Sequence, residues 1–142
     1  MNIRPAEMAD AKDLHWLSSE LGYLYPLEKL KINLARAIAD DKHCLLVAIL
    51  DGKVYGYCHA EDYEPLYADH VLNILGLVVD QTKQRQGIGS RLLAEMATVA
   101  LSKGMTAIRL NSSQERVAAH IFYEKNGYVS KKQQKHFMKR LK

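Results

Sequence analysis

The segment Val79-Asp80-Gln81-Thr82-Lys83-Gln84-Arg85-Gln86-Gly87-Ile88-Gly89-Ser90 connects an apolar run to a helical pattern. The run before it, residues 70–79, reads HVLNILGLVV and is typical of a strand buried on both faces. From Gly87 to about Gly104, apolar residues recur at helical spacing: Ile88, Leu92, Met96 and Ala100. The sequence therefore predicts a buried strand, a short polar loop and a long helix that begins at a glycine-rich turn.

The glycine-rich turn is suited to hold phosphate. The first N–H groups of a helix lack intrahelical partners and carry partial positive charge, so a helix N-terminus attracts anions. Gly87 and Gly89 have no Cβ where a ligand approaches the backbone, and Lys83 and Arg85 add positive charge nearby. We therefore expect a phosphate-bearing ligand here, with a ligand-free glycine turn as the alternative.

Two other phosphate-binding turns fit the segment poorly. A dinucleotide-binding turn requires a third glycine at the position of Leu92. A P-loop requires Lys followed by Ser or Thr after its last glycine, where this chain has Ser90 and Arg91. Neither motif is complete in this sequence.

Hairpins and helices account for the rest of the chain. Further strands are predicted at residues 1–4, 43–50, 53–61 and 106–110, and two more within 128–141. Further helices are predicted at residues 5–22, 26–40 and 115–125. The order β-α-α-β-β-β-α-β-α-β-β predicts one mixed α/β domain, residues 1–142, with a single central sheet.

The cysteines and histidines indicate no cross-link and no metal site. If the flanking runs pair around the Asp51-Gly52-Lys53 turn, Cys44 lies opposite about position 60, so it is poorly placed to bond Cys58. We expect two buried, reduced thiols, which suits a cytoplasmic protein. Neither these cysteines nor the six histidines show metal-ligand spacing.

Composition and charge narrow the function classes. A chain of 142 residues with 48% hydrophobic and 25% charged residues fits a single soluble domain. A net charge of +4 favours an anionic small ligand but is far from the clustered charge of nucleic-acid-binding proteins. No apolar run approaches a membrane span, and the N-terminus lacks a signal-peptide core. We therefore expect a cytoplasmic protein with neither nucleic acid nor membrane as a partner.

Two motifs resemble those of one enzyme family. Gln84-x-x-Gly87-x-Gly89 resembles the Q/R-x-x-G-x-G/A pyrophosphate loop of GNAT acetyltransferases. The segment RVAAHIFYEKNGY, from Arg116 to Tyr128, is similar to the family's late helix, R-x-x-A-H-x-F-Y-E-x-x-G-Y/F. The element order also resembles that of this fold. The resemblance implies a mostly antiparallel sheet in which the strand ending at Val79 splays away from the strand near Leu110.

The resemblance implies acetyl-coenzyme A as the cofactor. The backbone of three strand residues would pair with the pantetheine arm: Leu77, Val78 and Val79. The loop and the start of the helix would hold the pyrophosphate: Gln84, Arg85, Gln86, Gly87, Ile88, Gly89 and Ser90. Three residues of the late helix complete the expected site: Arg116, His120 and Tyr123. Arg116 stands where many relatives carry asparagine, and a packing role is the alternative for His120.

Acetyl transfer to an amine needs a neutral amine, a donor for the oxyanion and a proton for the departing thiolate. The resemblance implies Tyr123 as the general acid, with an ordinary core tyrosine as the alternative. The backbone N–H of Val79 is the expected oxyanion donor.

The general base is less obvious. Many members of this family carry a carboxylate on the strand before the pyrophosphate loop, whereas residues 73–77 here contain none. Glu61, grouped with Asp62 and Glu64, is the candidate base, acting directly or through a water. A solvated acidic loop is the alternative interpretation of these three residues.

The sequence thus predicts an N-acetyltransferase that moves an acetyl group to a primary amine of a small molecule through a tetrahedral intermediate. Aromatic and acidic residues expected near the acceptor suit a cationic amine: Glu20, Tyr23, Tyr25, Glu61, Tyr63, Glu64 and Tyr67. The alternatives are a protein or peptide acceptor, and a non-catalytic module that binds acyl-coenzyme A. We expect a monomer or a homodimer.

Overall fold

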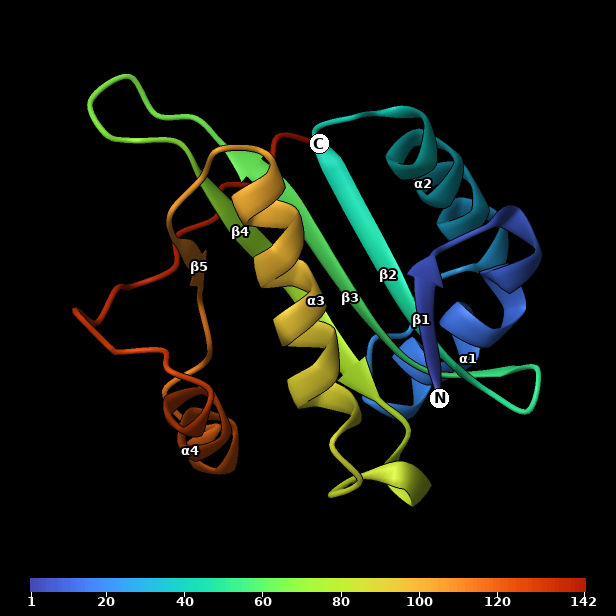
Figure 1. Ribbon diagram of the computed structural model, residues 1–142. Coiled ribbons are helices and arrows are strands. Elements are labelled where there is room, and N and C mark those ends of the chain that lie inside the picture. The colour runs from blue at the N-terminus through green and yellow to red at the C-terminus, as the bar shows by residue number, and fades with distance from the viewer. The chain divides into compact units, whose positions relative to one another are not determined.

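A five-stranded sheet organises the first of two compact units in the computed structural model, which describes residues 1–142 (Figure 1). The units are Met1–Asn111 and Ser112–Lys142. The strands lie in chain order: β1 (Asn2–Pro5), β2 (His43–Leu50), β3 (Lys53–Tyr63), β4 (Val71–Val79) and β5 (Ile108–Leu110). The first four pair antiparallel, and β5 runs parallel to β4. The predicted mixed α/β fold with a mostly antiparallel sheet is confirmed.

Helices cover both faces of this sheet (Figure 1). The short helix η1 (Met8–Asp10), α1 (Ala11–Glu20) and α2 (Leu27–Ala39) contribute to the core on one face. That core joins helix residues to strand residues: Leu14, Leu17, Leu34, Val47, Val54 and Val78. On the other face lies α3 (Ile88–Ser102), whose inner residues Leu92 and Met96 are fully buried. Each fully buried side chain of this size contributes about 1.5–3 kcal/mol to folding.

A two-residue turn sets the register of the β2–β3 hairpin. Asp51 and Gly52 have φ values of 51° and 76°, the left-handed pair that a type I′ turn requires. The register then shifts by one residue between Ala48 and Ile49, and this shift places Cys44 opposite Ala60, as predicted. Both thiols are free, with Cys58 completely buried and Cys44 half-buried.

The boundaries of several elements differ from the sequence prediction. The first helix begins after Pro5, at η1 and then α1, and Pro26 is the N-cap of α2 rather than its first residue. Strand β3 continues through Tyr63, because Glu61, Asp62 and Tyr63 each pair with a residue of β4. Asp62 and Tyr63, which the sequence analysis placed after the strand, therefore belong to the sheet, whereas Glu64 lies beyond it.

The second unit contains one helix, α4 (Val117–Lys125), and no strand. The two final strands predicted within residues 128–141 are wrong. From position 129 onward the side chains are exposed, and many are Lys or Gln. A strand is stable when a partner satisfies its backbone and one of its faces is buried, and this segment shows neither condition. No helix in either unit has the length and apolar content needed to cross a bilayer.

Candidate active site

Strand β4 has β5 as a neighbour along only the first half of its length. Its ladder to β5 joins only Leu72, Asn73 and Ile74 to Ile108, Arg109 and Leu110. Beyond Ile74, β4 continues to Val79 with β3 on one side and no strand of its unit on the other. This geometry matches the predicted splay, and it leaves backbone N–H and C=O groups around Leu77 and Val79 able to pair with an added extended chain.

A bulge reshapes β4 at the point where its edge opens. His59 pairs with Gly76 and Ala60 pairs with Ile74, so Leu75 is the extra residue. The bulge keeps Asn73, Gly76 and Val78 on the face that α1 and α2 cover. A Cβ built on Gly76 meets no atom within 4 Å, so this face is open above Gly76.

The loop after β4 is held by a buried carboxylate. Asp80 is 3% exposed, and its carboxylate accepts hydrogen bonds from the N–H of Thr82 at 2.9 Å and its hydroxyl at 2.8 Å. The N–H of Asp80 donates to the carbonyl of Tyr55 at 2.8 Å. These bonds fix the short helix η2 (Gln81–Lys83) and so define where the predicted pyrophosphate loop begins.

Two residues with a left-handed backbone conformation lead the chain from this loop into α3. Arg85 has a φ of 67° and Gly87 a φ of 81°. The N–H of Arg91 donates to the carbonyl of Gly87 at 3.0 Å, so it makes the first hydrogen bond of the helix. The N–H groups of Ile88, Gly89 and Ser90 precede that bond and have no intrahelical acceptor.

The loop and helix start therefore have the chemistry of an anion site. Gln84, Arg85, Gln86 and Gly87 are exposed, so a ligand reaches their backbone. The ammonium group of Lys83 lies 5.1 Å from the centre of the Tyr55 ring, which holds its charge beside the loop. Unpaired N–H groups, the helix dipole and these charges together fit a diphosphate.

Gly56 on β3 lets the start of α3 approach the sheet. A Cβ at this position would lie 3.1 Å from Ile88 Cγ2, 3.1 Å from the carbonyl oxygen of Val78 and 3.3 Å from Leu92 Cδ1. Two of these atoms belong to the start of α3, and the third is strand backbone that cannot rotate away. The contact couples the position of the anion site to β4.

We expect Gly56→Ala to lower the free energy of unfolding by about 1–3 kcal/mol, because the helix must move away from the sheet. Denaturant titration measures this change, and Gly76→Ala is the matched control, since its Cβ meets nothing. Equal stability of Gly56→Ala and the wild type would contradict the packing argument.

The late-helix residues lie in the second unit. Arg116 is the N-cap of α4. His120 Nε2 lies 2.8 Å from the carbonyl oxygen of Ser113, so one ring nitrogen is engaged locally. The Tyr123 ring packs edge-on against Phe122 and Tyr128, at centroid distances of 5.4 and 5.9 Å. The helix thus holds these residues in a defined local arrangement, and their predicted cofactor contacts remain predictions.

The structure separates Glu61 from the other two acidic residues of its segment. Glu61 shares the α1/α2 face with Asn73, whose amide donates to its carboxylate at 3.5 Å. Arg109 in turn donates to the amide oxygen of Asn73 at 2.8 Å and stacks 4.3 Å from the Tyr63 ring centre. A polar row therefore crosses three strands on this face.

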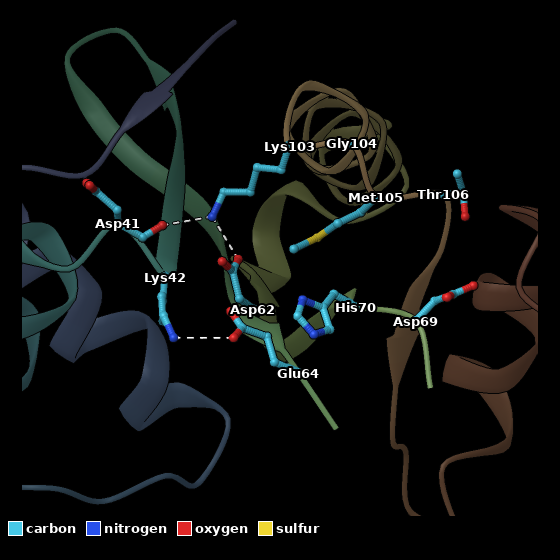
Figure 2. Close-up of a pocket in the computed structure, with 10 residues that line it drawn as sticks. All are labelled: Asp41, Lys42, Asp62, Glu64, Asp69, His70, Lys103, Gly104, Met105 and Thr106. Carbon is cyan, nitrogen blue, oxygen red and sulfur yellow. Dashed lines mark hydrogen bonds and ion pairs between the residues drawn. The ribbon is translucent and has the colours of Figure 1, made fainter. Parts of the chain in front are cut away.

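Asp62 and Glu64, unlike Glu61, line a cavity of about 720 Å³ (Figure 2). Lys103 donates to the Asp62 carboxylate at 2.7 Å, and Lys42 to that of Glu64 at 3.4 Å, so both carboxylates are paired. Residues just after α3 also line this cavity, whereas the anion site lies before α3. A helix of 15 residues is about 22 Å long, so the cavity and the anion site are at opposite ends of it.

Two histidines that the sequence analysis did not select lie beside Glu61. His43 Nδ1 and His59 Nε2 are 3.0 Å apart, with ring centroids separated by 5.2 Å. The hairpin register contained the signal, because pairing Cys44 with position 60 places His43 and His59 diagonally on one face. The structure shows no group of three or more His, Cys, Asp or Glu side chains able to hold a metal ion.

Comparisons with known proteins agree with this arrangement. The model of the acetyltransferase (GNAT) family matches residues 9–128. N-acetylaspartate synthetase of Rattus norvegicus is 32% identical over 85 residues, which are 60% of this chain and 27% of that protein. The match thus spans about a quarter of that relative's length.

Solved structures share the fold over the whole chain. An apo aminoglycoside antibiotic 6'-N-acetyltransferase from Acinetobacter haemolyticus superposes with a TM-score of 0.88 at 20% identity, covering 100% of both chains. The aminoglycoside N-acetyltransferase AAC(6')-Iy in complex with CoA has a TM-score of 0.83 at 17% identity, covering 98% of this chain and 99% of that one. With the family match across 9–128, the chain belongs to the GNAT acetyltransferase family.

Proposed function

We propose that the protein is an acetyl-coenzyme A-dependent N-acetyltransferase that acetylates a primary amine of a small molecule. One observation carries the proposal: the open edge of β4 is followed, after the loop of residues 80–86, by a glycine turn with unpaired helix N–H groups. An extended thioester arm and a diphosphate are adjacent in coenzyme A, and these two backbone features are adjacent in the chain. The CoA complex of the structural relative supports the same ligand.

Each predicted cofactor residue then has a role. Backbone groups of Leu77, Val78 and Val79 pair with the pantetheine arm. The pyrophosphate is held by the segment of Gln84, Arg85, Gln86, Gly87, Ile88, Gly89 and Ser90. Arg116, His120 and Tyr123 of α4 complete the site, and residues 1–142 act as one acetyltransferase domain, since the family match extends across both units.

The reaction joins R–NH₂ and the acetyl thioester to give the N-acetyl amine and free thiol. An alkyl ammonium with a pKa of about 10.4 costs roughly 4–5 kcal/mol to neutralise at pH 7, so the site must remove a proton before attack. The N–H of Val79 donates to the developing oxyanion. Tyr123 gives its phenolic proton to the leaving thiolate and regains one from the nitrogen that has become bonded to the acetyl carbon. Glu61 is the candidate base on the acceptor side, acting directly or through a water.

The acceptor is a small amine with cationic character. The connection between α1 and α2 presents Tyr23 and Tyr25, which are 61% and 45% exposed, and aromatic faces attract ammonium groups. Glu20 ends α1 beside them. The aminoglycoside acceptors named for the structural relatives are polyamines of this kind.

Release of free thiol from acetyl-coenzyme A across a panel of amines tests this function. The panel contains aminoglycosides, polyamines, amino acids including aspartate, and short peptides, at mildly alkaline pH. We expect release that depends on one class of small amine. Release with peptides alone would indicate a protein acceptor, and binding of acetyl-coenzyme A without any release would indicate a non-catalytic module.

A further inference from the structure

His43 and His59 form a hydrogen-bonded pair on the α1/α2 face of the sheet. Their 3.0 Å contact joins His43 Nδ1 to His59 Nε2, so one ring donates and the other accepts. The contact leaves one nitrogen of each ring outside the bond: His59 Nδ1 and His43 Nε2. Both side chains are only half-buried. A proton that enters at one end of such a pair can leave at the other.

The pair lies next to the open part of β4. His59 is directly opposite Gly76, so the two side-chain positions share one face. Gly76 has no side chain, and the space where a Cβ would project is empty to 4 Å. Gly76 also directly precedes Leu77, the first of the three strand residues proposed to pair with the pantetheine arm. The free space beside His59 is therefore where an amine can approach this strand from the α1/α2 face.

We propose that His59 removes the proton from the acceptor's ammonium group and that His43 passes it to solvent. The proposal rests on the proposed function and assigns the role of base to His59, with Glu61 as the competing candidate. The ammonium N–H bond breaks and the proton joins the imidazole of His59. The proton on His59 Nε2 then moves to His43 Nδ1, and His43 Nε2 releases one to water. Both rings are then neutral with their N–H on the opposite nitrogen, and proton exchange with water restores the starting tautomers before the next turnover. The amine keeps the lone pair that attacks the acetyl carbon.

The charges around His59 suit this role. Burial lowers the pKa of His59 below its ordinary value, with the neighbouring His43 as a second cause, while Glu61 acts in the opposite direction. His59 is therefore neutral and able to accept a proton at pH 7. From β4 it faces Gly76, and on its own strand Tyr57 bonds the uncharged Ser18 of α1. Once His59 is protonated, the Glu61 carboxylate stabilises the positive charge.

The test is the pH profile of kcat/KM for an alkyl amine in the wild type and in His59→Gln. The wild-type profile should rise through the lowered pKa of His59 and then flatten. Without the base only neutral amine reacts, so the His59→Gln profile should keep rising toward the pKa of the amine. The loss should be about 100-fold at pH 7 and should disappear near pH 10. His43→Gln should lose about 10-fold at pH 7, because a water can replace the second step.

Three comparisons keep the test decisive. His70→Gln, at a histidine that lines the 720 Å³ cavity, should retain the wild-type profile. In His59→Ala, added imidazole should restore activity, which a purely structural role does not predict. Acetyl-coenzyme A affinity should be unchanged in every variant.

An unaltered profile in His59→Gln overturns the proposal and leaves the acetyltransferase function intact. A profile altered in Glu61→Gln but not in His59→Gln assigns the base to Glu61 instead. A wild type that transfers acetyl to no amine overturns both the function and this role.

Discussion

Replacing Tyr123 by Phe should reduce kcat by about 100- to 1,000-fold while the affinity for acetyl-coenzyme A stays within a few-fold of the wild type. The substitution removes only the hydroxyl, so the ring contacts to Phe122 and Tyr128 persist. The thiolate of coenzyme A then leaves without a proton donor, which raises the barrier of the step that breaks the C–S bond. Steady-state kinetics with the best amine of the panel, together with calorimetric titration of acetyl-coenzyme A, measures both quantities.

Tyr128→Phe is the matched control for this prediction. Tyr128 is half-buried in the same unit and packs against Tyr123, but it lies outside α4. It should therefore retain kcat within a few-fold. Equal kcat values for Tyr123→Phe and the wild type would remove Tyr123 from the mechanism. Equal losses in both variants would indicate that the aromatic cluster, rather than one hydroxyl, is needed.

Replacing Gly87 by Val should weaken acetyl-coenzyme A binding at least about 100-fold. Gly87 has a φ of 81°, a conformation that β-branched residues rarely adopt, so the turn must change its shape. The N–H groups of Ile88 and Gly89 then lose their common direction. Each charge-assisted hydrogen bond contributes about 1.5–3 kcal/mol, so two lost bonds correspond to 100-fold or more.

A glycine just after α3 separates the binding effect from backbone strain. Gly104 has a φ of 77° just after the C-terminal end of the same helix, so Gly104→Val experiences comparable strain far from the loop. Both variants should lose similar stability, but only Gly87→Val should lose affinity. Similar affinities of the two variants for acetyl-coenzyme A would place the pyrophosphate elsewhere.

Most of the first unit was predictable because its signals are local. The apolar runs of β2 and β4, the Asp51-Gly52 turn and the amphipathic pattern of α3 each define an element without reference to distant residues. The extension of β3 through Tyr63 was not predictable in this way. Asp62 and Tyr63 are in the strand because β4 supplies their partners, which is a tertiary effect.

The prediction of two final strands was wrong because no other strand pairs with that segment. The residues after Tyr128 are mostly polar, and their apolar members, Val129, Phe137, Met138 and Leu141, do not recur with the period of a strand. A pattern cannot supply the hydrogen-bond partners that a strand requires. In the structure these residues have exposed side chains and form no ladder.

The candidate site also contains some features with a local sequence signal and others that depend on tertiary pairing. Glycines at a helix start are a local signal, so the anion site was recognised from residues 84–90 alone. The bulge at Leu75 was invisible, because one extra residue in a strand changes which side chains share a face without changing composition. The contact of His43 with His59 depends on the exact pairing of two strands, including the register shift between Ala48 and Ile49, which the hairpin turn does not imply.

The burial of Cys58 bears on whether a cysteine of the protein can carry the acetyl group during transfer. Desolvation raises the pKa of this thiol to about 12, and burial also raises the pKa of Cys44. At pH 7 only about one Cys58 in 10⁵ is a thiolate, the form that attacks a thioester. The chain thus offers no ready thiolate to carry an acyl group between two half-reactions. We therefore expect that neither cysteine acts as an acyl carrier between donor and acceptor.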